Sequence, residues 1–519
     1  MAAARLPYDV PAPSPIHSVV ARVPLLSGTR LVVASAPADA RVLRPPPPGR
    51  ATDVEAATRE ALRFPLDGPP LAALAARATR VTILVEPPAL PIGSVLGDPR
   101  RQAVAAVSET LDELGVPTEN QTLLVACGLA RRASRPEIAA LVPPEFRRRF
   151  HGRLAVHDAA DPALAGLPAG APRVRVAPEL VETDLVVVVS AAESVLHGGP
   201  ATLLAAADAE TQRRATAESL LETGGSEGWR VATLVERALA DRVPLFGVSL
   251  VLNHPQFTGP LRGYPYEPEA AERIARSPLR FAFAASPESV RRRVLRSLRG
   301  VRTAAVVLAG PPSVVHAEAL LRAIELRRAT LDEPLDALVI AIPGVTPFLP
   351  RENPNPLLAA HLGLAHALGL WRDAFPVADG GIVILVHRFR RVFARPTQQP
   401  YLVFFRSDPI ARDPRLLAAA EEAVAADARA LEEYRAGRTV HPLLPFRDWE
   451  ACRPALERVG AVYVAGARDA AAVRQLGFVP IGGIGAAIQM ARGHRGQDAR
   501  IGFLLAPPYF PLRVASTWP

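Results

Sequence analysis

Three consecutive segments decide the fold: VTILVE (81–86), RQAVAAVSETLDELG (101–115) and QTLLVACG (121–128). The first and third are short, apolar and rich in β-branched residues, which favours buried strands. The second has apolar residues at helical spacing and stops at Gly115, which favours an α-helix. Apolar strands separated by helices are typical of a parallel sheet covered by helices on both faces.

The same alternation continues along the chain. Further strands are expected at 153–159, 184–191, 335–344, 380–389, 461–466 and 500–507. Further helices are expected at 361–371, 416–437 and 470–477, and a strand followed by a helix at 301–328. Ser134 and Glu137 have the spacing of a capping box, which predicts a helix start there. The pattern predicts an α/β protein of two domains, each a mostly parallel sheet flanked by helices, with a cleft between them.

The length of 519 residues also favours two domains, and 49% hydrophobic residues are enough for buried cores. We expect a first domain at 1–299 and a second at 300–495. A C-terminal segment at 496–519 could return to the first domain. There is no uncharged apolar run of about 18 residues and no signal-like apolar region at the N-terminus. A cytoplasmic protein without membrane contact is therefore expected.

The charged residues exclude some chemistry. The net charge is +9, yet all 60 basic residues are arginines, and there is no lysine. Lysine Schiff bases, lysine bases and lysine-tethered cofactors are thereby excluded. The arginines are spread out and not interleaved with aromatic residues, so solvated helix faces are favoured over a nucleic-acid site. Cys127 and Cys452 lack metal-ligand spacing, so we expect structural thiols and no metal site.

Ligands of open parallel sheets bind where loops leave the carboxyl ends of the strands. Four loops are therefore candidates for lining the cleft: 86–98, 127–135, 190–202 and 343–361.

Several segments carry a family resemblance. They are ALRFPLDGPPL (61–71), VTILVEPPALP (81–91), LLVACGLARRASRPEI (123–138), VHDA (156–159), HGGPATLLAA (197–206), LDALVIAIPG (335–344), DGGIVILV (379–386) and LGFVPIGGIGAAIQMA (476–491). In this order they resemble motifs of the nickel-pincer lactate racemase family. The resemblance implies that family's N-terminal and C-terminal domains and an isomerase acting on 2-hydroxy acids. It also implies a nickel-pincer nucleotide, a pyridinium dithiocarboxylate usually tethered to a lysine.

The sequence departs from the family at functional positions. The aspartate of the family's first motif falls on Glu86, which keeps the carboxylate, whereas its arginine falls on Ala89. One acid/base histidine falls on Ala130 and the tethering lysine on Ala201. The histidine before the family's glycine pair falls near Ala191 or Ala192, the next family histidine near Ala217, and a Gln and a Lys of the second domain near His361 and His366.

The remaining polar residues give a candidate site. We expect Glu86 and His197 as catalytic residues, although a histidine before two glycines more often hydrogen-bonds a turn. The resemblance places Gly128, Gly198 and Gly199 at a cofactor, whose identity stays unknown because lysine tethering is impossible. Arg351 and Asn353 are candidates for binding substrate. His361 and His366 are five residues apart and do not share an α-helical face, which disfavours a joint metal site.

Two functions remain open. One is a divergent 2-hydroxy-acid racemase or epimerase of altered chemistry. The other is a non-catalytic relative, a pseudoenzyme that binds a small anion or a partner protein. Convergence of Glu86, His197 and the 343–361 loop on one hollow would favour the enzyme, and a cleft filled by apolar side chains would favour the second function.

Overall fold

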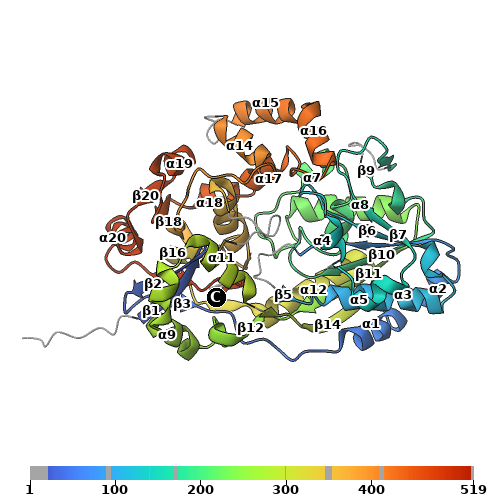
Figure 1. Cartoon of the computed structure of the whole chain (residues 1–519), viewed down its shortest axis with the longest axis horizontal. Helices are drawn as coiled ribbons and strands as arrows, with labels where there is room; N and C mark the ends of the chain where they lie inside the picture. The colour runs from blue at the N-terminus through green and yellow to red at the C-terminus, as the bar shows by residue number, and fades with distance from the viewer. Residues whose placement is uncertain are drawn as a thin grey trace, which may run out of the picture.

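The computed structural model describes residues 21–88, 95–139, 141–168, 174–298, 300–344, 354–407 and 414–515. Two lobes lie side by side, each with a six-stranded sheet at its centre (Figure 1). The strands of the first sheet are, in order, β14 (Ala304–Gly310), β11 (Leu245–Leu252), β10 (Leu185–Ala191), β4 (Val81–Val85), β6 (Gln121–Val125) and β7 (Arg153–Val156). Those of the second are β20 (Val479–Ile481), β19 (Ala461–Ala465), β18 (Val377–Val386), β16 (Leu335–Ala341), β21 (Ile501–Leu504) and β3 (Arg41–Leu43).

The predicted fold class is confirmed. In the first sheet all pairings are parallel except the edge pairing of β14 with β11, and in the second all are parallel. β10 is buried at every position, as its valine run requires in a sheet covered on both faces. The sequence analysis did not identify β11, which is equally apolar and lies next to β10.

Helices cover both sheets (Figure 1). Those of the first lobe are α1 (Val54–Arg63), α2 (Leu71–Ala75), α3 (Arg100–Glu113), α4 (Arg135–Ala139), α5 (Pro144–Arg149), α6 (Pro200–Leu204), α7 (Ala209–Arg213), α8 (Glu227–Ala240) and α12 (Pro312–Arg327). The second lobe and its borders carry α9 (Pro268–Arg276), α10 (Leu279–Ala285), α11 (Glu288–Ser297), α13 (Pro356–Ala360), α14 (Gln399–Arg406), α15 (Pro414–Ala425), α16 (Ala428–Arg435), α17 (Leu444–Glu450), α18 (Arg453–Arg458), α19 (Ala470–Gln475) and α20 (Ile484–Arg495). No helix in these ranges is long and apolar enough to cross a bilayer.

The chain passes between the two sheets more than once. β3, near the N-terminus, forms the edge of the second sheet, while β14, which follows residue 300, forms the edge of the first. In the C-terminal segment, β21 lies inside the second sheet, and β22 (Leu512–Val514) pairs with β15 (Ala329–Leu331) and β17 (Trp371–Arg372). The domain limits expected from the sequence stay a prediction, and these crossings tie the lobes together.

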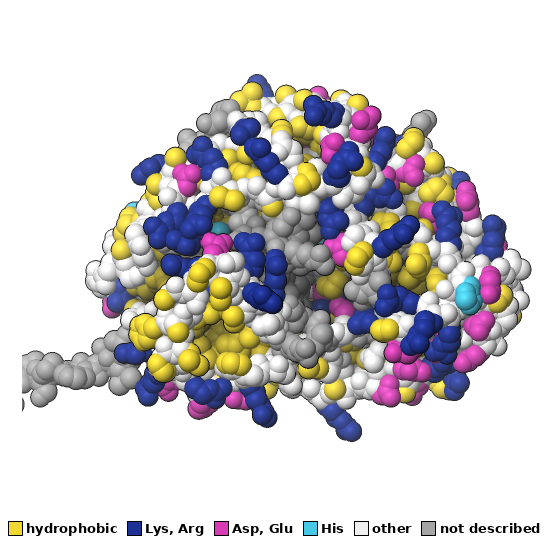
Figure 2. Space-filling model, viewed as in Figure 1, with side chains coloured by type: hydrophobic (Ala, Val, Ile, Leu, Met, Phe, Trp, Pro, Cys, Tyr) yellow, Lys and Arg dark blue, Asp and Glu magenta, His cyan; other side chains and the backbone are white. Residues whose placement is uncertain are grey.

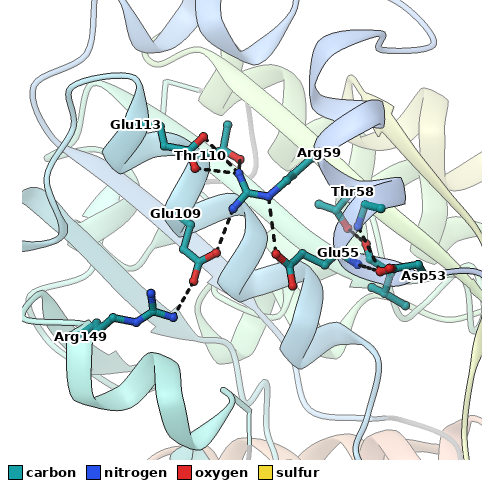
Figure 3. Close-up of polar contacts among 10 residues, drawn as sticks. Asp53, Glu55, Thr58, Arg59, Glu109, Thr110, Glu113 and Arg149 are labelled. Atoms are coloured by element: carbon teal, nitrogen blue, oxygen red, sulfur yellow. Dashed lines mark hydrogen bonds and ion pairs between the residues drawn. The ribbon is translucent and has the colours of Figure 1, made fainter.

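An arginine ties three helices of the first lobe together. Arg59 of α1 pairs with Glu109 and Glu113 of α3 at 3.0 Å each, and Glu109 also accepts a hydrogen bond from Arg149 of α5 (Figure 3). The Asp53 side chain accepts hydrogen bonds from two backbone amides and so begins α1.

Two predicted helices differ from the structure. The long helix expected at 416–437 is divided, because the Asp427 side chain accepts a hydrogen bond from the Ala430 amide and begins α16. The segment His361–Ala367 is a π-helix (η4) that continues α13.

The crossing of β21 into the second sheet predicts a large stability effect for Phe503→Ala. Phe503 is fully buried between β16 and β3 in the second lobe, so its truncation leaves a cavity and should lower the free energy of unfolding by about 3–5 kcal/mol. Urea denaturation followed by tryptophan fluorescence measures this. Phe64→Ala is the control, because Phe64 is 77% exposed and should change stability by less than about 0.5 kcal/mol. Equal losses in both variants would contradict the packing of β21.

Candidate functional site

A cavity of about 990 Å³ lies between the two lobes. Glu86 after β4, Gly128 after β6 and His197 after β10 line it from the first lobe, and Gly344 after β16 lines it from the second. They come together because parallel strands end at the same edge of their sheet, as expected for the loops chosen from the sequence. Figure 2 shows the hollow between the lobes, with arginine side chains on both of its sides.

Glu86 is a buried carboxyl group at the floor of the cleft. It is 3% exposed, and its Oε1 atom has no hydrogen-bond partner among the described residues. Burial and, to a lesser extent, the charge of Glu193 raise its pKa to about 8, although Arg100 opposes the shift. Glu86 is therefore mostly protonated at neutral pH and can donate a proton.

Beside Glu86 lies a network of four buried charges. Arg100, 1% exposed, pairs with Asp98 at 2.7 Å and approaches Glu193 at 3.6 Å. Arg302 pairs with Glu193 at 3.2 Å and approaches Asp98 at 3.6 Å. Although burial opposes it, the Arg100 guanidinium holds the pKa of Asp98 below its usual range. The sequence analysis chose the loops that hold Asp98 and Glu193 but did not single out these residues, because they carry no motif and the pairs with Glu193 and Arg302 join segments far apart in the chain.

His197 lies in a tight turn after β10. Its Nδ1 atom lies 3.0 Å from the Ser194 hydroxyl, and its Nε2 atom forms no hydrogen bond with the described residues, so it can meet a ligand. Burial lowers the pKa of His197 to about 4, so the ring is neutral near pH 7. The turn contact predicted as an alternative role is thus present, and the ring still lines the cleft.

The two glycines after His197 pack closely against α12 and the end of β10. A Cβ atom at Gly198 would lie 2.3 Å from the Ala191 carbonyl oxygen and 2.3 Å from the His316 ring, and one at Gly199 would lie 2.3 Å from the His316 Cβ. Both have positive φ. The close approach of α12 explains these two glycines without a cofactor. Their predicted role in cofactor binding stays a prediction, as does that of Gly128.

Two histidines of the second lobe reach the same cleft. His361 and His366 line it, with ring centroids 4.7 Å apart. The expectation that they do not share a face was wrong, because residues five apart stack on one face of a π-helix. His366 lies 6.4 Å from His197 between centroids, and neither of its ring nitrogens has a partner among the described residues. Burial lowers its pKa well below the usual value.

The sequence analysis also named Arg351, Asn353 and Cys127. Arg351 and Asn353 are outside the described residues, so their role in substrate binding stays a prediction. Cys127 lines the cleft, but burial raises the pKa of its thiol to about 11, so it is not a thiolate nucleophile at neutral pH.

The residues present do not fit a tethered nickel-pincer nucleotide. Ala201, at the position of the family's lysine, lies buried in α6 and offers no nucleophile, and Ala130 cannot carry a proton. Within the described ranges, no three His, Cys, Asp or Glu side chains are grouped to hold a metal ion.

The packing of the turn predicts the effect of Gly198→Ala. The new Cβ would overlap His316 and the strand carbonyl at a positive φ, so the variant should lose about 3 kcal/mol or more of unfolding free energy. Chemical denaturation measures the loss. Gly224→Ala is the matched control, since its Cβ meets nothing within 4 Å. A Gly198→Ala protein as stable as this control would refute the close approach.

The raised pKa of Glu86 predicts a pH-dependent stability. In the unfolded chain the carboxyl group titrates near 4.5, and in the folded protein near 8. Between these values the folded state holds the extra proton, so the contribution of Glu86 to stability is greatest below pH 4.5 and is lost as pH rises toward 8, by up to about 1.4 kcal/mol per pH unit. Glu86→Gln should remove this slope. Urea unfolding at pH 5 to 8 measures it, and parallel curves for both proteins would contradict the assignment.

Comparison with known proteins bears on the fold and on the first domain. Residues 28–197 match the family model of the lactate racemase N-terminal domain. The chain is similar to the structure of the lactate racemase apoprotein from Thermoanaerobacterium thermosaccharolyticum, with a TM-score of 0.59 and 14% identity over 95% of this chain and 100% of that one. A protein from Thermotoga maritima matches with a TM-score of 0.48 and 13% identity, over 90% of this chain and 100% of that one. No curated protein sequence matches.

At 14% identity the structural match shows the fold alone, and the family model adds the sequence pattern of the first domain. Residues 28–197 thus carry the sequence pattern of the lactate racemase N-terminal domain, and the chain as a whole shares the fold of the lactate racemase apoprotein.

Proposed function

We propose that the cleft is the active site of an enzyme that removes the C2 proton of a small 2-hydroxy acid and returns a proton to the same carbon. The observation that carries the proposal is that Glu86 and His197 of one lobe and His361 and His366 of the other line one cavity. Titratable groups from both lobes can then approach a bound molecule from different directions, as acid/base chemistry on one carbon requires.

The pKa values of Glu86 and His197 suit opposite roles. Near pH 7 Glu86, with a pKa of about 8, mostly keeps its proton and can donate it, while His197, with a pKa of about 4, is neutral and can accept one through Nε2. Environments that push two pKa values apart separate an acid from a base. The C2–H bond of the substrate would break toward His197, the electron pair would stay on the substrate, and Glu86 would return a proton to C2. Both groups recover by exchange with water.

A hydrogen–deuterium exchange experiment tests this reaction. The protein, without added nickel, is incubated in D2O with L-lactate and with other small 2-hydroxy acids, and the C2 proton is followed by ¹H NMR. We expect the C2 signal of at least one acid to disappear as the opposite enantiomer forms. Glu86→Gln and His197→Gln should each lower the rate at least about 100-fold, since acid/base groups contribute that much.

The matched control is His494→Gln, because His494 is exposed on α20 and does not line the cleft. It should leave the rate unchanged. Racemisation that retains the C2 hydrogen would refute direct proton transfer to a solvent-exchanging base, and no reaction with any acid would refute the enzyme.

A non-catalytic anion-binding protein is the second candidate. It is favoured by Ala130 and Ala201 at the family's functional positions and by other apolar side chains in the cleft wall, such as Leu196 and Leu204. Binding of a 2-hydroxy acid without exchange at C2 would support it.

A further inference from the structure

Arg447 is a cation of the cleft that forms no direct ion pair with any described residue. It lies in α17, is half-buried and lines the cavity. Its side chain forms no hydrogen bond or ion pair within the part of the chain that the structure describes. Two other cleft arginines are neutralised: Arg131 pairs with Glu137 at 2.6 Å, and Arg302 with Glu193 at 3.2 Å. A guanidinium withdrawn from water and left unpaired is costly unless an anion meets it.

The groups around Arg447 can bind an anion and do not compete for it. Arg447 acts on the pKa values of both His197 and His366, lowering each, which places its charge near these rings. His366 is 3% exposed, lines the cavity and has no hydrogen-bond partner on either nitrogen within the described ranges. A neutral imidazole carries one N–H, which can donate to a carboxylate oxygen beside the guanidinium.

The neighbouring carboxylate, Asp448, offsets the charge of Arg447 only in part. Its Oδ2 accepts a hydrogen bond from the Tyr401 hydroxyl at 2.5 Å, and its backbone oxygen lies 2.9 Å from His361 Nδ1. Burial lowers the pKa of Arg447, and the charge of Asp448 opposes this shift, although no atom of its carboxylate is within ion-pair distance of the guanidinium among the described contacts. α17 thus holds at the cleft a guanidinium that Asp448 attracts without pairing with it directly.

We propose that Arg447 and His366 form the subsite that binds the carboxylate group of the substrate, on the wall of the cleft that the second lobe supplies. The inference rests on the proposed function and names the part of the site that recognises a monoanionic carboxylate. Arg447 supplies the charge and a planar fork that matches a carboxylate, and His366 supplies a directed donor. Glu86 and His197 of the first lobe are then left for C2.

Isothermal titration calorimetry of the full chain with sodium L-lactate tests the subsite. Lactamide, the uncharged analogue, should bind at least tenfold more weakly than lactate to the unmodified protein. Arg447→Gln should weaken lactate binding at least tenfold, and His366→Leu about three- to tenfold. Arg453→Gln is the matched control, because Arg453 lies on the adjacent helix α18, is 63% exposed and does not line the cleft. It should bind within twofold of the unmodified protein.

Equal binding of lactate and lactamide would overturn the inference, as would full affinity in Arg447→Gln. Binding of inorganic phosphate without binding of lactate would also overturn it. Glu86→Gln separates the two proposals, since it should retain lactate binding while losing exchange at C2. If lactate binds through Arg447 and no exchange occurs, the subsite stands and the proposed reaction fails.

Discussion

The structure depends on the buried pairing of Arg100 and Arg302 with Asp98 and Glu193. Ions buried in protein cost several kcal/mol each unless they are paired, so no member can move alone. The four residues come from the loop before α3, the start of α3, the loop after β10 and the short segment that precedes β14. Their pairing therefore fixes the carboxyl end of the first sheet in one arrangement, including the segment after residue 300.

The same network sets the chemistry of the cleft. Glu193 lies close enough to Glu86 to disfavour a second negative charge, and burial acts in the same direction. Arg100 already interacts with Asp98 and Glu193. Its attraction for Glu86 therefore offsets only part of the rise in the Glu86 pKa. A carboxyl group that would be charged on the surface is thus kept neutral, and the first lobe presents a proton donor to the cleft.

The apolar runs allowed most of the fold to be predicted. A strand that is buried on both faces is apolar throughout, so it can be recognised from its own few residues. The capping box was predicted for the same local reason, and the Ser134 amide and hydroxyl do donate to Glu137. Half of the candidate site was also predictable, since Glu86 follows β4 directly and His197 lies in the loop after β10. His366 and Arg447 were not, because their place depends on a π-helix and on packing between distant segments. A spacing of five residues means different faces in an α-helix and one face in a π-helix.

The glycine turn shows how packing can require a particular residue. Gly198 and Gly199 are required by the close approach of His316. The Nε2 atom of this histidine lies 2.9 Å from the backbone carbonyl oxygen of Ser194. This requirement comes from packing alone and holds whether or not a cofactor binds. Ala201, two residues further on, has no such constraint on its chemistry, because any small side chain fits its buried place in α6. The conformation of this turn is therefore explained by packing alone, and it is independent of the chemistry that the cleft performs.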